Sequence, residues 1–188
     1  MSDPARYDIP KILEQMRADY WHGLETADAG EAVARTDHII VAIGGLRCGL
    51  PATACREVLR LPRIVRVPRL PEHLPGIVNL RGEIVAVTDL RPLLGRPVAA
   101  PTASSRLVVI AADGVRTALL VERVEGLRAV ADGAVEGLTE GAVRTAVELF
   151  AGKVEEDDGA LLLIDPRRLL ARPELIVDRR RGAEADTD

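Results

Sequence analysis

The sequence predicts a mainly β protein, made of two similar small barrels with short helices and preceded by a helical N-terminal extension. Hydrophobic residues make up 47% of the chain but aromatic residues only 2%, so Val, Leu, Ile and Ala must fill the core. Branched Val and Ile side chains favour strands. The segments 85–97 and 161–173 also align without gaps and share six of thirteen residues. Each combines an apolar strand, an aspartate and a short helix, so the repeat predicts two similar halves. The alternative is that this common arrangement arose twice by chance.

The first 37 residues form a predicted appendage to the main domain. Apolar residues recur at helical spacing over residues 10–26 and predict an amphipathic helix that starts near Pro10. Residues 1–37 contain eight acids and four bases, and Tyr20 and Trp21 lie in the predicted helix. This helix could self-associate, pack on the barrels or bind a particular partner.

The main domain is expected over residues 38–172. Apolar runs separated by Gly-containing turns predict four hairpins, over 38–51, 76–88, 106–124 and 147–165. Asp89 is expected to cap a short helix that ends at Gly95, and residues 166–171 predict the second short helix. Residues 126–146 give no clear pattern, and the tail over 173–188 is expected to fray at its end.

Charge and composition predict a cytoplasmic protein without nucleic-acid partners or direct membrane insertion. The net charge of −4 gives no overall basic field that would attract nucleic acid. No apolar run approaches the ~20 residues that span a bilayer, and the N-terminus shows no signal peptide. Cys48 and Cys55 have no CxxC spacing, so two buried thiols are expected rather than a disulfide or a zinc site.

The chain shows no catalytic, metal or cofactor motif, so we predict a protein that is not an enzyme and needs no cofactor. Its three histidines lack a metal-binding context, and Ser104 and Ser105 lack the GxSxG elbow. The acidic run over 155–158 lacks the spacing of a calcium loop and predicts a solvated turn. The histidines are His22, His38 and His73.

An arginine-rich segment over 56–69 leaves two interpretations open. It has no interleaved aromatic residues, so it lacks the stacking surfaces of single-strand nucleic-acid binders. Either the arginines protect a strand edge from aggregation, or they form a docking patch for an acidic partner. The arginines are Arg56, Arg60, Arg63, Arg66 and Arg69.

Residues 75–90 form the most informative segment. Two buried strands are expected there, joined by a turn that presents the planar guanidinium of Arg81 beside Gly82. Gly76 would let another backbone or helix approach closely. The alternative is that Arg81 is merely the polar residue that a turn needs.

GIVNLRGEIVAVTDLRPLLG, residues 76–95, closely resembles the signature of the CheW-like domain family, in which G-x-x-N-L-R-G precedes an apolar strand and D-L. The resemblance runs from about His38 to about Leu170. It implies two packed SH3-like five-stranded barrels and a non-enzymatic scaffold in chemotaxis-type two-component signalling. The implied partners are the cytoplasmic tip of a chemoreceptor and the regulatory domain of the CheA histidine kinase, in arrays at the membrane. The alternative is a CheW-like regulator that competes for those sites or serves a different array.

The resemblance also implies which residues bind the receptor or kinase. Gly76 and Arg81 match family residues implicated in receptor and array contacts, and Asn79 and Gly82 complete the signature turn. Cys55 is an approximate match on the strand that faces the receptor in the family. Ala86 departs from the pattern, because the family often has proline there.

Overall fold

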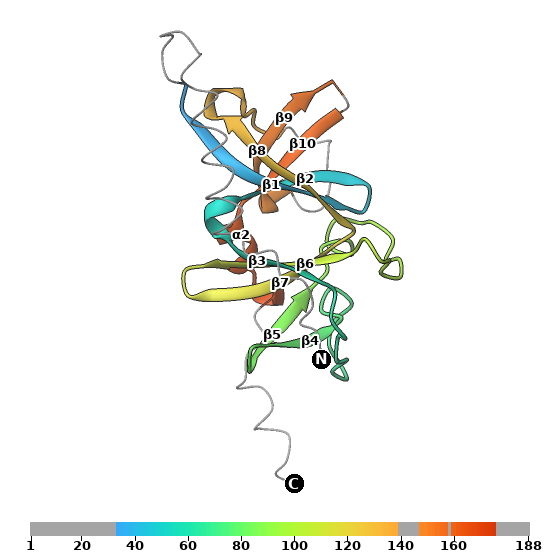
Figure 1. Ribbon diagram of the computed structural model, residues 1–188. Coiled ribbons are helices and arrows are strands. Elements are labelled where there is room, and N and C mark those ends of the chain that lie inside the picture. Colours follow the sequence, from blue (N-terminus) through green and yellow to red (C-terminus); the bar gives the residue numbers. More distant parts are fainter. Residues whose placement is uncertain (1–32, 139–146, 158, 176–188) are drawn as a thin grey trace.

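Two curled β-sheets lie one above the other in the computed structural model, which describes residues 33–138, 147–157 and 159–175 (Figure 1). The helix predicted over 10–26 lies outside these residues, as does the tail beyond residue 175. Helix α2 covers Pro166–Leu170. The strands are β1 Arg35–Ile43, β2 Leu46–Pro51, β3 Cys55–Arg60, β4 Gly76–Leu80, β5 Glu83–Thr88, β6 Arg106–Ala112, β7 Val115–Val121, β8 Arg123–Ala131, β9 Phe150–Glu156 and β10 Gly159–Ile164. Short 3-10 turns cover Ala52–Ala54, Asp132–Ala134, Val147–Leu149 and Pro173–Leu175.

The strand order shows that the two halves of the chain exchange strands. One sheet has the order β8-β1-β2-β10-β9 and is called here the first barrel. The other has the order β3-β6-β7-β5-β4 and is called the second barrel. Both contain a central antiparallel hairpin, β1–β2 or β6–β7, whose second strand pairs in parallel with β10 or β5. The two barrels therefore have the same topology, which confirms the two similar halves predicted from the sequence repeat.

Each barrel is closed by a short antiparallel bridge, in which one edge strand pairs with a residue outside the named strands. In the second barrel, Val65 and Ile77 exchange two hydrogen bonds of 2.9 Å. In the first barrel, Glu136 and Lys153 exchange two of 2.8 Å. Residues 77 and 153 are 76 positions apart, the same offset as in the sequence repeat, so the closures are equivalent.

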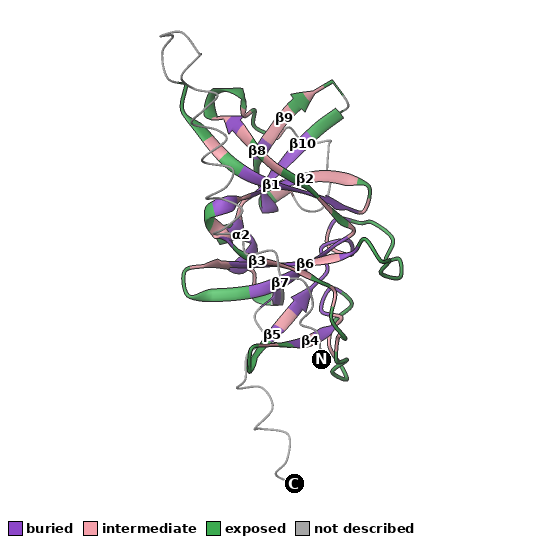
Figure 2. Cartoon of the chain, viewed as in Figure 1, coloured by how far each residue is buried: buried purple, intermediate pink, exposed green. Residues whose placement is uncertain are grey.

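The buried apolar residues that the structure describes form three clusters, and long parts of the central strands are buried (Figure 2). Ile39, Val41 and Ile43 of β1 face the second barrel, while Ile40 faces the interior of the first. Strand β6 repeats this alternation, with Leu107 and Val109 inside its own barrel and its other core residues facing the first barrel. Burial on both faces explains the uninterrupted apolar runs of these strands. The largest core holds the two barrels together.

The short helices follow the two equivalent aspartates, with one difference. Asp165 accepts hydrogen bonds from the backbone N–H groups of Arg167 and Arg168 and caps α2 as predicted. After Asp89 the structure has a single turn instead of the predicted helix, although Asp89 accepts a hydrogen bond of 3.0 Å from the Arg91 N–H, as Asp165 does from the Arg167 N–H. The turn ends at Gly95 with φ 64°, in the left-handed conformation that the sequence predicted. In the described ranges, no helix is long and apolar enough to cross a membrane.

Candidate functional site: the hairpin tip and the groove between the barrels

The β4–β5 hairpin presents Arg81 at an exposed turn. Arg81 and Gly82 have φ values of 55° and 90°, typical of a two-residue type I′ turn. The side-chain oxygen of Asn79 accepts a hydrogen bond of 2.8 Å from the Gly82 N–H and fixes the turn. The Arg81 side chain is 63% exposed and lies 3.4 Å from a carboxylate oxygen of Glu57 on β3. The guanidinium is therefore oriented but remains open to a partner.

Gly76, the first residue of β4, is buried where the second barrel closes. Its φ is 152°, and a Cβ atom there would lie 2.2 Å from the carbonyl oxygen of Val65. The close backbone approach expected from the sequence thus occurs within the chain itself. Gly152 holds the equivalent place in the first barrel, where a Cβ would lie 2.6 Å from the carbonyl oxygen of Glu136. The sequence interpretation missed Gly152, although the offset of 76 residues could have found it.

Cys55 begins β3 and its side chain is buried in the core between the barrels. Burial raises the pKa of its thiol from an ordinary value of 9.0 to about 12, so the group is neutral at physiological pH. Cys48 is buried in the same core, and burial raises its pKa to about 12 as well. Of the five predicted site residues, Asn79, Arg81 and Gly82 therefore meet at one exposed turn, while Cys55 and Gly76 are internal.

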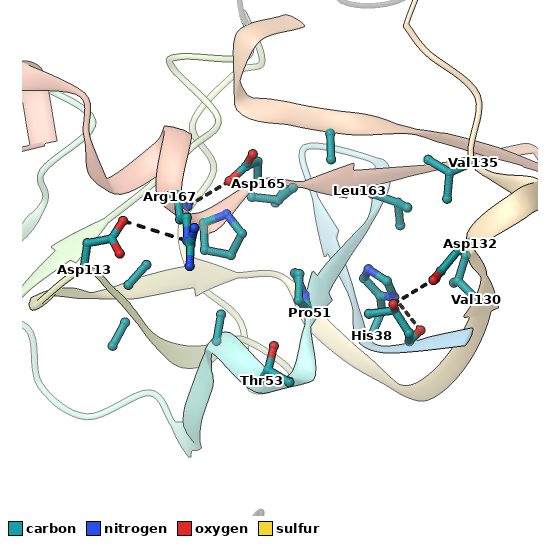
Figure 3. A pocket seen from close by; sticks show the side chains of 17 residues that line it. His38, Pro51, Thr53, Asp113, Val130, Asp132, Val135, Leu163, Asp165 and Arg167 are labelled. Carbon is teal, nitrogen blue, oxygen red and sulfur yellow. Dashed lines mark hydrogen bonds and ion pairs between the residues drawn. The ribbon is translucent and has the colours of Figure 1, made fainter. Parts of the chain in front are cut away.

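A groove of about 510 Å³ opens between the barrels, next to the 3-10 turn that precedes Cys55 (Figure 3). Its walls come from both sheets and from the start of α2, and they combine apolar side chains with a charged rim. The apolar lining consists of Pro51, Ala54, Ala111, Ala112, Val130, Val135, Ala151, Leu163, Ile164 and Pro166. The rim carries Asp113, Asp132, Asp165 and Arg167. A groove with this lining suits the apolar face of a helix.

The equivalent region on the other side of the molecule carries a buried ion pair, called here the ionic latch. Asp89 and Arg91 form a buried bidentate pair with contacts of 2.7–3.1 Å. The hydrogen bonds that the Arg91 guanidinium donates to the Asp89 carboxylate are the main cause that raises the pKa of Arg91. Glu122, in the crossover from β7 to β8, lies 4.0 Å from Arg91 and accepts hydrogen bonds from the N–H groups of Gly44 and Gly45. The latch thus ties the β1–β2 turn of the first barrel to the second barrel.

On the groove side the same positions carry smaller or more exposed groups. The crossover from β2 to β3 contains Thr53 and Ala54 where the other crossover has Glu122. Arg167, equivalent to Arg91, makes only a long contact of 3.9 Å with Asp113, and both side chains are largely exposed. The two sides therefore differ in their ionic contacts, although a hollow of about 470 Å³ lined in part by Asp89 and Arg91 also lies on the latch side.

The described residues contain no group of three or more His, Cys, Asp or Glu side chains that could hold a metal ion. His38 and His73 are both buried, and they lie in different barrels. Nδ1 of His38 is 2.9 Å from the carbonyl oxygen of Thr36.

Two packed five-stranded barrels with a groove between them define the class, a double SH3-like β-barrel domain. A profile of the CheW-like domain matches residues 37–174, so the chain belongs to the CheW-like domain family of chemotaxis adaptors. It is 24% identical over 132 residues to the chemotaxis protein CheW of Bacillus subtilis, covering 70% of this chain and 85% of that protein. It is also 29% identical over 106 residues to the protein FrzA of Myxococcus xanthus, covering 56% and 66%. The scaffolding protein TtCheW from Thermoanaerobacter tengcongensis has the same fold, with a TM-score of 0.65 at 21% identity over 74% of this chain and 90% of that one.

Proposed function

We propose that this protein is a non-enzymatic scaffold that couples chemoreceptors to the CheA histidine kinase. The observation that carries the proposal is the groove between the barrels, with its apolar walls and charged rim. Chemoreceptor tips are helical in the family that the sequence resembles. An amphipathic helix binds such a groove by burying its apolar side chains, while its polar residues meet the rim. The protein would act in the cytoplasm, at receptor arrays of the membrane.

In this proposal, the kinase-binding surface is the outer face of the second barrel. Val65 and Ile84 are 54% and 58% exposed. They lie on adjacent parts of this barrel, because Val65 pairs with Ile77 and Ile84 pairs with Asn79. Exposed apolar side chains close to Arg81 fit a protein interface with an apolar centre and a polar rim. A coupling protein must bind both partners at once, so one face would bind the receptor and another face would bind the kinase.

Filling the groove tests the receptor half of the proposal. Thr53 is exposed within the groove, so Thr53→Trp should occupy the space without disturbing the core. We expect binding to a purified receptor cytoplasmic fragment to weaken at least tenfold in calorimetry, and binding to the CheA regulatory domain to stay unchanged. Ala103→Trp, at an exposed loop position outside the groove, is the matched control. Equal receptor binding by the two variants would refute the groove assignment.

A further inference from the structure

The side chains of five exposed arginines on the second barrel have no partner among the residues that the structure describes. They are Arg56, Arg60, Arg63, Arg66 and Arg69, called here the arginine strip. None of these side chains makes a hydrogen bond or ion pair with another described residue. Arginines elsewhere in the described residues are often paired. Arg47, Arg116 and Arg128, for example, contact glutamates. Among the described residues, no acidic side chain therefore neutralises the positive charges of the strip.

Protection of a sheet edge accounts for only part of the strip. Strand β3 is at one end of its sheet and ends at Arg60, so Arg56 and Arg60 can discourage edge-to-edge pairing. Arg63, Arg66 and Arg69 lie beyond the strand, in the connection to β4. Edge protection gives no reason for three exposed arginines there.

The local charge favours an acidic partner. Residues 56–69 contain five arginines and one acid, Glu57, which is already engaged by Arg81. Like charges within one short segment repel one another, and an acidic surface that docks on them relieves the repulsion. The segment has no aromatic residue for base stacking, and the net charge of the chain is −4, so nucleic acid fits less well.

An apolar hollow adjoins the strip. It has a volume of about 470 Å³ and is lined by Leu61, Pro62 and Ile64 from the arginine-rich segment. Val98, Ala99 and Pro101 line it from the opposite connection, and Arg66 stands at its wall. Arginine beside an apolar hollow fits a partner in which an apolar side chain is flanked by carboxylates.

We propose that the arginine strip and this hollow bind an acidic surface of the CheA regulatory domain, next to the apolar contact through Val65. This inference rests on the proposed function, and it adds the chemistry of the partner's surface. Val65 lies between Arg63 and Arg66, so the strip is continuous with the proposed kinase face. The strip speeds and strengthens docking through charge, while the apolar contact supplies most of the affinity.

Charge removal tests the proposal in the full chain. The double variant Arg63→Gln, Arg66→Gln should bind the purified CheA regulatory domain about three- to tenfold more weakly in about 50 mM salt, with a shallower dependence on salt concentration. Arg35→Gln, Arg123→Gln removes the same charge from exposed positions of the first barrel and should bind as wild type. Thermal unfolding of both variants verifies that the fold is retained.

The outcomes separate the inference from the proposed function. Wild-type protein that fails to bind the kinase domain would overturn the proposed function. If the Arg63, Arg66 variant binds the kinase domain as tightly as wild type and with the same salt dependence, the inference about the arginine strip is overturned and the proposed function stands. Fluorescent duplex DNA is measured in parallel, and tighter binding to DNA than to the kinase domain would overturn the assignment of an acidic protein surface.

Discussion

At the scale of single residues, Arg81 contributes its side chain to the surface and little to stability. It forms an exposed ion pair with Glu57, of a kind that stabilises proteins by about 0–1 kcal/mol. We expect Arg81→Ala to leave the unfolding midpoint within a few degrees of wild type while weakening assembly with the receptor and kinase. Circular dichroism melting and binding measurements check both parts. Loss of the fold would favour the alternative that Arg81 only shapes its turn.

Gly76 and Gly152 should behave as a structural pair. An added Cβ at either position meets backbone, which cannot move aside as a flexible side chain can. We expect Gly76→Ala and Gly152→Ala each to lower the free energy of unfolding by at least about 2 kcal/mol, as measured by urea denaturation. Gly133→Ala is the control, since nothing lies within 4 Å of its added Cβ. Near-zero effects at both test positions would contradict the closure role.

The two buried thiols predict a dependence on pH. Burial raises the pKa of Cys48 and Cys55 from 9.0 to about 12. Both should therefore resist iodoacetamide at pH 8 in the native protein and react fully in denaturant. Between about pH 9 and 12 the unfolded chain loses thiol protons that the folded chain keeps, so stability should fall as pH rises through that window. Rapid labelling of native protein would show that the core between the barrels is open.

The binding residues were only partly predictable from the sequence. Asn79, Arg81 and Gly82 could be placed together because a hairpin turn is local, and its residues are adjacent in the chain. The buried positions of Cys55 and Gly76 depend on contacts with distant segments, which local patterns do not report. The groove brings Thr53 beside Asp113 and Arg167, and no pattern along the chain joins those three.

At the scale of elements, the ionic latch connects the end of β5, the crossover to β8 and the β1–β2 turn. Arg91→Ala would leave the Asp89 carboxylate buried without its counterion, so we expect a loss of about 3–5 kcal/mol in the free energy of unfolding. Arg167→Ala removes the equivalent arginine on the groove side, where the ion pair is long and exposed, and should cost less than about 1 kcal/mol. Equal losses would contradict the asymmetry between the two sides.

Local patterning predicted most strands and their hairpin partners, but not the pairings between strands that are distant in the chain. The hairpins formed by β1–β2, β4–β5 and β6–β7 follow from apolar runs around short turns with positive φ. Strand β8 was missed because its mixed burial gives no regular alternation, and six of its nine residues fell in the unassigned segment after residue 125. It pairs with β1 in the first barrel although it follows β7 of the second barrel along the chain, and such an exchange depends on the global packing.

At the scale of the whole molecule, a nearly twofold arrangement is broken at functional places. The closures at Gly76 and Gly152 and the aspartates Asp89 and Asp165 are matched between halves. The ionic contacts differ, with a buried pair at Asp89 and Arg91 on one side and a long, exposed pair at Arg167 and Asp113 on the other. The repeat predicted the shared topology, while these differences depend on the residues that each half brings to the contact between the barrels.

The most direct test of the coupling account is the autophosphorylation rate of CheA with a receptor fragment, in the presence or absence of this protein. The account predicts that the rate rises only when all three components are present. Thr53→Trp should abolish the rise while kinase binding is retained, and Ile84→Glu should abolish it while receptor binding is retained. A fall in rate on addition of the wild-type protein would favour a competing regulator. Failure to bind either partner at about tens of micromolar would contradict the coupling account.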